Sequence, residues 1–245
     1  MTSREVILRE MGLTPIWVSR SGVGESAEAE PPTPVVALAG SPESAQEPDQ
    51  TAADREAVVA NLPWDELIAS IATCTACRLC KTRTHTVPGV GDRSPLWMVI
   101  GEAPGENEDK QGEPFVGKAG QLLDAMLAAV GKKRGDGVYI ANVIKCRPPG
   151  NRNPEPDEIA ACAPYLSRQI ALAQPKLLLA SGKFAAQTLL NCGDTVGAMR
   201  ALPAASSQLA GVPIVVTYHP SYLLRSPLEK AKAWDDLMKA KALVA

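Results

Sequence analysis

The chain has 245 residues, of which 45% are apolar, 21% charged and only 4% aromatic, and its net charge is −2. One domain with an appendage is the expected organisation at this length. No apolar run approaches the ~18–20 residues of a membrane span, and the N-terminus lacks the apolar stretch of a secretory signal, so we expect a cytoplasmic protein without a membrane partner. Residues 1–55 hold nine acidic and four basic side chains, which leaves a small positive balance on the remainder and permits contacts with phosphates.

The N-terminal part of the chain differs in composition from the rest. Residues 1–21 carry apolar side chains that approximate one helical face, and two interpretations stay open: a helix that folds back on the domain, or a motif that docks on a partner protein. Residues 22–55 are rich in Ala, Pro, Glu and Ser and predict a disordered linker, because they offer too little apolar surface to offset the entropy of ordering. The folded domain is expected over residues 56–245.

From there on, the pattern alternates between helices and strands. Predicted strands are mainly apolar runs of six to nine residues at 96–101, 138–146, 176–181 and 212–219. Apolar residues at helical spacing predict helices at 65–71, 117–131, 156–172, 181–191 and 227–244. Strands that alternate with helices imply an α/β fold with a largely parallel sheet covered on both faces.

Six cysteines suggest metal or redox chemistry, because disulfides are rare in cytosolic proteins. They are Cys74, Cys77, Cys80, Cys146, Cys162 and Cys192. Zinc and iron–sulfur centres both accept four thiolates. The wide spacing of the Cys146–Cys162 pair favours an iron–sulfur cluster, with zinc as the alternative. Cys192 lies near neither group and is expected to be a free small residue.

Polar residues follow the predicted strands, at the sheet edge where α/β proteins bind ligands. The segment 101–117 contains several acidic residues, which favours a neutral ligand over a phosphate. Asn142 lies among apolar neighbours, so its amide either makes a structural hydrogen bond or offers a donor and an acceptor to a planar ligand. His219 ends the fourth strand and precedes a proline, a position that favours chemistry over packing.

Three motifs, GEAPGENEDKQGEPFVGKAG, NVIKCRPPGNRNP and HPSYLLR, together with Cys74, Cys77, Cys146 and Cys162, resemble the family 4 uracil-DNA glycosylases, the iron–sulfur-containing bacterial and archaeal type. The resemblance spans roughly residues 65–240. It implies a three-layer α/β/α sandwich with a central four-stranded, mainly parallel sheet, and a [4Fe–4S] cluster bound by those four cysteines. It also implies a monomeric, monofunctional hydrolase of base excision repair, which flips deoxyuridine out of single- or double-stranded DNA, releases uracil and leaves an abasic site.

The resemblance gives roles to residues in the pocket. Phe115 would stack on uracil, Asn142 would bond O4 and N3–H, and His219 would donate to O2 as the base leaves. Backbone amides near Ala103 would contact the same base. Many relatives have an Asp that positions water where this chain has Ala103. The activating group is therefore open, with the two carboxylates Glu102 and Glu108 as candidates for a dissociative, oxocarbenium-like reaction.

The same motifs suggest where DNA would bind. Ser221 and Arg225 would hold phosphates, and Leu223 or Leu224 would wedge into the gap left by the flipped base, although loop packing is an equal alternative for these residues. Lys145, Arg147 and Arg152, near the cluster, would meet further phosphates. Two rival functions from other classes are a non-enzymatic DNA-binding module and a small electron-transfer protein. The pocket residues argue against both.

Overall fold

The computed structural model describes residues 52–203, 205–206 and 211–244. The predictions for residues 1–21 and for 22–51 lie outside this range. In the described part of the chain, no helix combines the length and apolar character needed to cross a membrane. Helix α2 (Ala52–Val59) begins inside the predicted linker, so the boundary at residue 56 was set too late. The Arg55 guanidinium explains this, because it donates to the Ala161 carbonyl and lies over the Tyr165 ring.

The centre of the fold is a sheet with the strand order β1-β3-β2-β4-β6-β5. Its four inner strands are parallel and confirm the predicted four-stranded core; they are β3 (Val138–Asn142), β2 (Trp97–Gly101), β4 (Leu177–Ser181) and β6 (Pro213–Thr217). Two antiparallel edge strands, β1 (Val90–Gly91) and β5 (Ala205–Ser206), were not predicted, because two residues are too few to show a periodic pattern.

Helices follow the strands in the expected order. The predicted helices correspond to α3 (Trp64–Thr73), α5 (Lys118–Ala129), α6 (Pro156–Ala173), α7 (Lys183–Leu190) and α10 (Lys230–Leu243). Short helices that were not predicted are α4 (Glu106–Gln111), α8 (Val196–Ala201), α9 (Pro220–Arg225), and the 3-10 turns η1 (Arg78–Lys81), η2 (Pro149–Asn151) and η3 (Pro227–Glu229). The predicted helix over 227–244 is therefore divided into η3 and α10.

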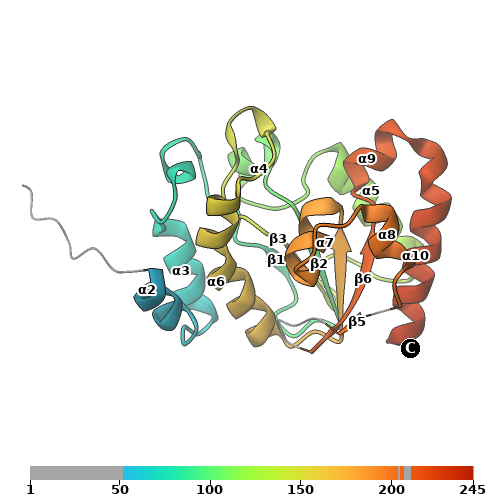
Figure 1. Ribbon diagram of the computed structural model, residues 1–245, viewed down its shortest axis with the longest axis horizontal. Helices are drawn as coiled ribbons and strands as arrows, with labels where there is room; N and C mark the ends of the chain where they lie inside the picture. The colour runs from blue at the N-terminus through green and yellow to red at the C-terminus, as the bar shows by residue number, and fades with distance from the viewer. Residues whose placement is uncertain (1–51, 204, 207–210, 245) are drawn as a thin grey trace, which may run out of the picture. The chain divides into compact units, whose positions relative to one another are not determined.

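The strands bury alternate side chains on opposite faces, which produces three layers. Met98 and Ile100 of β2 pack in one core with residues of α3, α6, α7 and α8. Trp97 and Val99 pack in the other core with residues of α5 and α10. Figure 1 shows α6 and α3 on one side of the sheet and α5 and α10 on the other. The α/β/α sandwich expected from the resemblance is confirmed.

Candidate functional site

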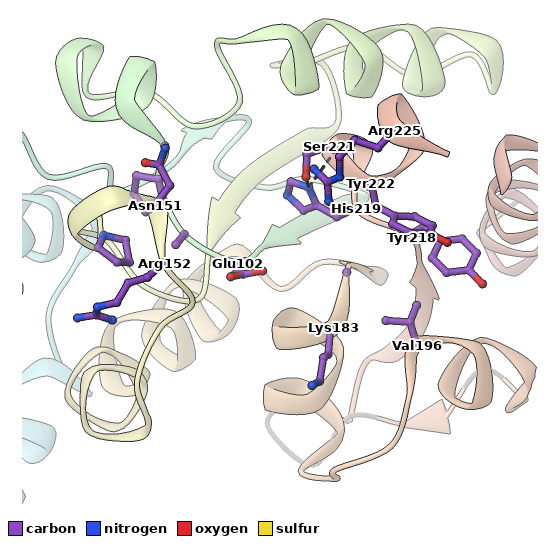
Figure 2. A pocket seen from close by; sticks show the side chains of 15 residues that line it. Glu102, Asn151, Arg152, Lys183, Val196, Tyr218, His219, Ser221, Tyr222 and Arg225 are labelled. Atoms are coloured by element: carbon purple, nitrogen blue, oxygen red, sulfur yellow. Dashed lines mark hydrogen bonds between the residues drawn. The ribbon is translucent and has the colours of Figure 1, made fainter. Parts of the chain in front are cut away.

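A cleft of about 470 Å³ opens at the carboxyl ends of the parallel strands. Six of the predicted residues line it: Glu102, Ala103, Arg152, His219, Ser221 and Arg225. In Figure 2 the Glu102 carboxylate lies in the middle, with Asn151 and Arg152 to one side and Tyr218 and Tyr222 to the other. Two other predicted residues, Phe115 and Asn142, do not line the cleft and lie at Gly101, next to the lining residue Glu102.

Phe115 and Asn142 converge at Gly101, the last residue of β2. Asn142 pairs with Gly101 in the register of β2 and β3 and is 2% exposed, and Phe115 is 6% exposed. A Cβ atom at Gly101 would lie 2.4 Å from Asn142 Oδ1 and 2.6 Å from Phe115 Cζ. Only glycine therefore lets the amide and the ring approach each other. Sequence reasoning missed this role, although a glycine that ends a buried strand is a recognisable signal of close approach.

The Phe115 ring is held in place from outside the cleft. Its backbone has a φ of 55°, in the left-handed region that non-glycine residues seldom adopt. Arg134 donates hydrogen bonds to the Pro114 carbonyl at 2.8 Å and to the Phe115 carbonyl at 2.9 Å, and it pairs with Asp124 at 3.0 Å. These bonds hold the strained turn and aim the ring at His219, with the two ring centres 5.4 Å apart and the ring planes at 28°. No sequence pattern pointed to Arg134.

His219 is fixed in one tautomer by the start of α9. Its Nδ1 atom accepts a hydrogen bond from the Ser221 backbone N–H at 3.2 Å and lies 2.8 Å from Ser221 Oγ. Since Nδ1 accepts, the neutral ring carries its proton on Nε2. Burial, together with the charge of Arg225, lowers the pKa of His219 to about 4. The imidazole is therefore neutral at physiological pH and has an N–H to donate.

The two candidate carboxylates differ in their surroundings. Glu108 accepts backbone N–H bonds from Val116 (3.0 Å) and Gly117 (3.2 Å) through Oε1 and from Gly105 (3.1 Å) through Oε2. It thus joins the loop after β2 to the loop that carries the Phe115 ring. Glu102 lines the cleft, and burial raises its pKa, partly opposed by the charge of Lys183.

The predicted DNA-binding residues lie on helix α9, and their exposure differs. Leu224 is 44% exposed, whereas Leu223 is 1% exposed and packs inside the fold, so only Leu224 is available as a wedge. Arg225 lines the cleft at the end of the helix. Ser221 also lines the cleft, but its N–H and hydroxyl are directed at His219. The sequence predicted that Ser221 contacts a DNA phosphate, and its contact with His219 was missed.

Four cysteines gather around a second, small cavity. Cys74, Cys77, Cys146 and Cys162 all line it, whereas Cys80 and Cys192 do not. In the described ranges, no three His, Cys, Asp or Glu side chains converge tightly enough to hold a single metal ion. The ligands of an iron–sulfur cluster bind separate irons and do not have to converge on one point. The four predicted ligands are therefore brought together as a set.

The surroundings of the sulfur atoms suit a metal centre. Burial raises the pKa of the Cys162 thiol to about 12 and also raises the pKa values of Cys146 and Cys77. Two donors reach the sulfurs: the Arg83 guanidinium to Cys146 Sγ at 3.2 Å and the Lys145 backbone N–H to Cys162 Sγ at 3.4 Å. Buried thiols with N–H donors on sulfur fit a cationic centre that would hold them as thiolates.

Lys145 links the cysteine cavity to Asn142. The prediction that Lys145 contacts a DNA phosphate was wrong. The side chain is 1% exposed, lines the cysteine cavity and donates from Nζ to the Asn142 carbonyl at 2.6 Å. Burial lowers its pKa to about 8, against the opposing charges of Cys162 and Cys146. A side chain enclosed in this way cannot reach DNA. It connects the backbone of Asn142 to the segment that carries two of the cysteines.

The two arginines beside Lys145 in the motif remain near the surface. Arg152 lines the cleft and forms bonds of 2.6 and 2.9 Å with the fully buried carboxylate of Glu158. Arg147 donates to Asn151 Oδ1 at 2.7 Å and lies 3.7 Å from Glu106. Both are partly exposed and only Arg152 lines the cleft, so the phosphate contacts of both stay a prediction.

Comparisons with known proteins point to one family. The model of the uracil DNA glycosylase superfamily matches residues 88–238. A type-4 uracil-DNA glycosylase of Archaeoglobus fulgidus is 41% identical over 71% of this chain and 90% of that protein. One of Thermotoga maritima is 41% identical over 71% of this chain and 91% of that protein. A type-5 uracil-DNA glycosylase of Thermus thermophilus is 30% identical over 50% of this chain. With the fold and the site, these matches show that the chain belongs to the uracil DNA glycosylase superfamily and, within it, to the type-4 uracil-DNA glycosylases.

Proposed function

We propose that this chain removes uracil from DNA by hydrolysis of the N-glycosidic bond, which is the first step of base excision repair. Membership of the type-4 family supports the activity. The observation that supports the site is the convergence of Asn142, Phe115 and His219 next to a cleft at the carboxyl ends of the strands. The substrate is DNA that contains deoxyuridine, and the protein acts on it as a monomer in the cytoplasm.

Each pocket residue performs a separate task in this proposal. The flipped base stacks on Phe115, and the Asn142 amide accepts from N3–H and donates to O4, a pattern that cytosine reverses. His219 donates its Nε2 proton to O2 and stabilises the negative charge that develops as uracil leaves. Backbone amides near Ala103 contact the base as well.

Glu102 is the carboxylate that assists the attacking water. Its raised pKa makes it a better base than an exposed carboxylate, and it faces the cleft. Glu108 has a positioning role instead, because its two oxygens already accept three backbone N–H bonds. The sugar carries positive charge in a dissociative reaction, so weak base assistance is sufficient.

Helix α9 and the basic side chains near the cleft bind the DNA. Leu224 fills the gap left by the flipped base, and Arg225, Arg147 and Arg152 neutralise phosphates. Ser221 reaches a phosphate only through the hydroxyl that also contacts His219.

The four cavity cysteines bind a [4Fe–4S] cluster, which joins the segment after α3 to the start of α6. Hydrolysis requires no electron transfer, so the cluster has a structural role. Through Lys145, the segment that it would hold also supports the backbone of Asn142.

An excision assay tests the proposed activity. Purified protein is incubated with a labelled oligonucleotide that contains one uracil, and abasic sites are then cleaved with alkali. We expect a cut strand with the wild-type protein and little cutting with Asn142→Ala, because that variant cannot pair with the base edge. An intact strand with cluster-loaded wild-type protein would show a binding module in place of an enzyme.

Cysteine variants test the cluster separately. Replacing any one of Cys74, Cys77, Cys146 and Cys162 with Ser should remove most of the iron, sulfide and visible absorbance of anaerobically purified protein. The Cys80→Ser and Cys192→Ser variants serve as matched controls and should keep all three, because neither residue lines the cavity. Loss of iron in the Cys80 variant, or zinc in place of iron in the wild type, would contradict this assignment.

A further inference from the structure

We propose that Tyr218 and Tyr222 form a second base subsite, which stacks an unpaired base adjacent to the excised uracil in the same DNA strand. This inference rests on the proposed function, since it assigns the next part of the same substrate. It gives the enzyme a substrate preference for DNA whose neighbouring base is free to leave the duplex.

The open cleft extends beyond the residues that would read the uracil. Phe115 and Asn142 are almost fully buried and do not line the cleft. The volume of about 470 Å³ lies in the range that accommodates a ligand of several rings. The cleft therefore has room for the sugar of the deoxyuridine and for a further nucleotide.

Two tyrosines stand together on one wall of this space. Their ring centres lie 5.1 Å apart with the planes at 33°, and both residues line the cleft. The other two tyrosines of the chain, Tyr139 and Tyr165, are each 3% exposed and belong to the core, whereas Tyr222 is 36% exposed. Figure 2 shows the pair across the cleft from Arg152. Exposed aromatic rings beside a cleft are the means by which proteins stack the bases of single strands.

The Tyr218 ring is held by a charged side chain as well as by its aromatic neighbour. The Arg200 guanidinium lies 4.7 Å from the centre of its ring. Arg200 is itself fixed by two bonds to Asp236, at 2.6 and 2.9 Å, and the Asp236 carboxylate is fully buried. Arg200 and Tyr222 both pack against the Tyr218 ring, so Tyr218 supports the exposed Tyr222 ring, on which the base stacks. The Tyr222 ring is therefore supported before any ligand arrives, which lowers the entropy lost when a base stacks on it.

The charges around the wall suit a nucleotide with its phosphate. Lys183 and Arg225 both line the same cleft as the two tyrosines. The cleft thus offers aromatic faces and cations together, the combination found in single-strand binding grooves. A base that stacks on this wall cannot pair with a complementary strand at the same time, so the subsite favours single-stranded DNA.

The test compares substrates with and without the base next to uracil, and proteins with and without the Tyr222 ring. Single-stranded oligonucleotides carry one uracil, with the adjoining base either present or replaced by a tetrahydrofuran abasic residue, on the 5′ or the 3′ side. We expect loss of the base on one side to lower kcat/KM of the wild type by about 5- to 150-fold. Tyr222→Ala should abolish that difference, and Tyr222→Phe, which keeps the ring, should retain it.

Two results would overturn the subsite. One is a wild-type enzyme that is indifferent to both neighbouring bases. The other is a Tyr222→Ala variant that loses the same factor with and without the neighbouring base, which would show a structural role only. Equal unfolding midpoints for the three proteins verify that the fold is intact. Failure of the proposed function is distinguishable, because then no oligonucleotide is cut by any of them.

Discussion

His219→Ala should lower kcat for uracil excision by about 10²–10³-fold while KM changes little. The reason is that the Nε2 proton is placed for the charge that appears on uracil O2 only as the bond breaks, and loss of one such donor typically costs that factor. Single-turnover excision from a uracil-containing oligonucleotide measures the effect. Ser221→Ala is the matched control. It keeps the backbone N–H that fixes the tautomer, and so it should lose only several-fold.

The protonation state of His219 gives this prediction a second readout. A pKa lowered to about 4 means that the ring is neutral above that pH, and that a proton is taken up only below it. The kcat/KM profile of the wild type should therefore show no inflection near pH 6.5 that depends on His219. The fall in acid should begin with protonation of Glu102, whose pKa burial raises, and His219 should contribute only as the pH approaches 4. An inflection near 6.5 that disappears in His219→Ala would contradict a neutral donor. Excision by His219→Ala within tenfold of the wild type would contradict the donor role itself.

Gly101→Ala should reduce kcat/KM by about 100-fold, although the change adds a single methyl group. The new Cβ would lie 2.4 Å from Asn142 Oδ1 and 2.6 Å from Phe115 Cζ, so the amide and the ring must both move. Misplacement of about 1 Å at a reacting site is enough to cause such a loss. Overpacking should also lower the free energy of unfolding by about 1–3 kcal/mol. Excision kinetics and guanidinium unfolding measure the two effects.

Gly193→Ala is the control for this substitution. A Cβ at that position meets no atom within 4 Å, so neither activity nor stability should change by a measurable amount. In Gly101→Ala, the loss of excision rate is to be compared with the loss of stability. A variant that loses stability but keeps its excision rate would show that Asn142 and Phe115 contribute to the core and not to a uracil pocket.

The parallel core was predictable because its strands are short, continuous apolar runs that end in polar or glycine residues. The ends of two strands were misjudged, since β6 ends at Thr217 and not at residue 219, and β3 ends at Asn142 and not at residue 146. In residues 143–146, beyond β3, the Val143 and Ile144 N–H groups bond the carbonyls of Gly101, the last residue of β2, and of Glu102, which follows it. This segment remains buried without being part of the sheet, so burial alone could not mark where β3 ends.

The elements that sequence reasoning missed depend on contacts between distant residues. Helix α4 is an acidic segment that looks like a solvated loop, and it is held by Glu108, which bonds N–H groups eight and nine residues further along. Helix α9 did carry a local signal, because His219 accepts from the Ser221 N–H and Pro220 takes the first helical position. The positions of Arg134 and Lys145 follow from tertiary packing and had no pattern to reveal them.

The residues that select the base and the residues that bind the DNA lie in parts of the fold that differ in how readily they open locally. Asn142 ends β3, pairs with Gly101 of β2 and has its carbonyl bonded by the buried Lys145 side chain, so its carbonyl and amide move only when the core of the fold opens. Leu224 and Arg225 are exposed at the end of a six-residue helix, which can fray there at little cost. As the temperature rises, the affinity for DNA would therefore fall well before the selectivity for uracil over cytosine does. The enzyme would then lose turnover before it lost fidelity.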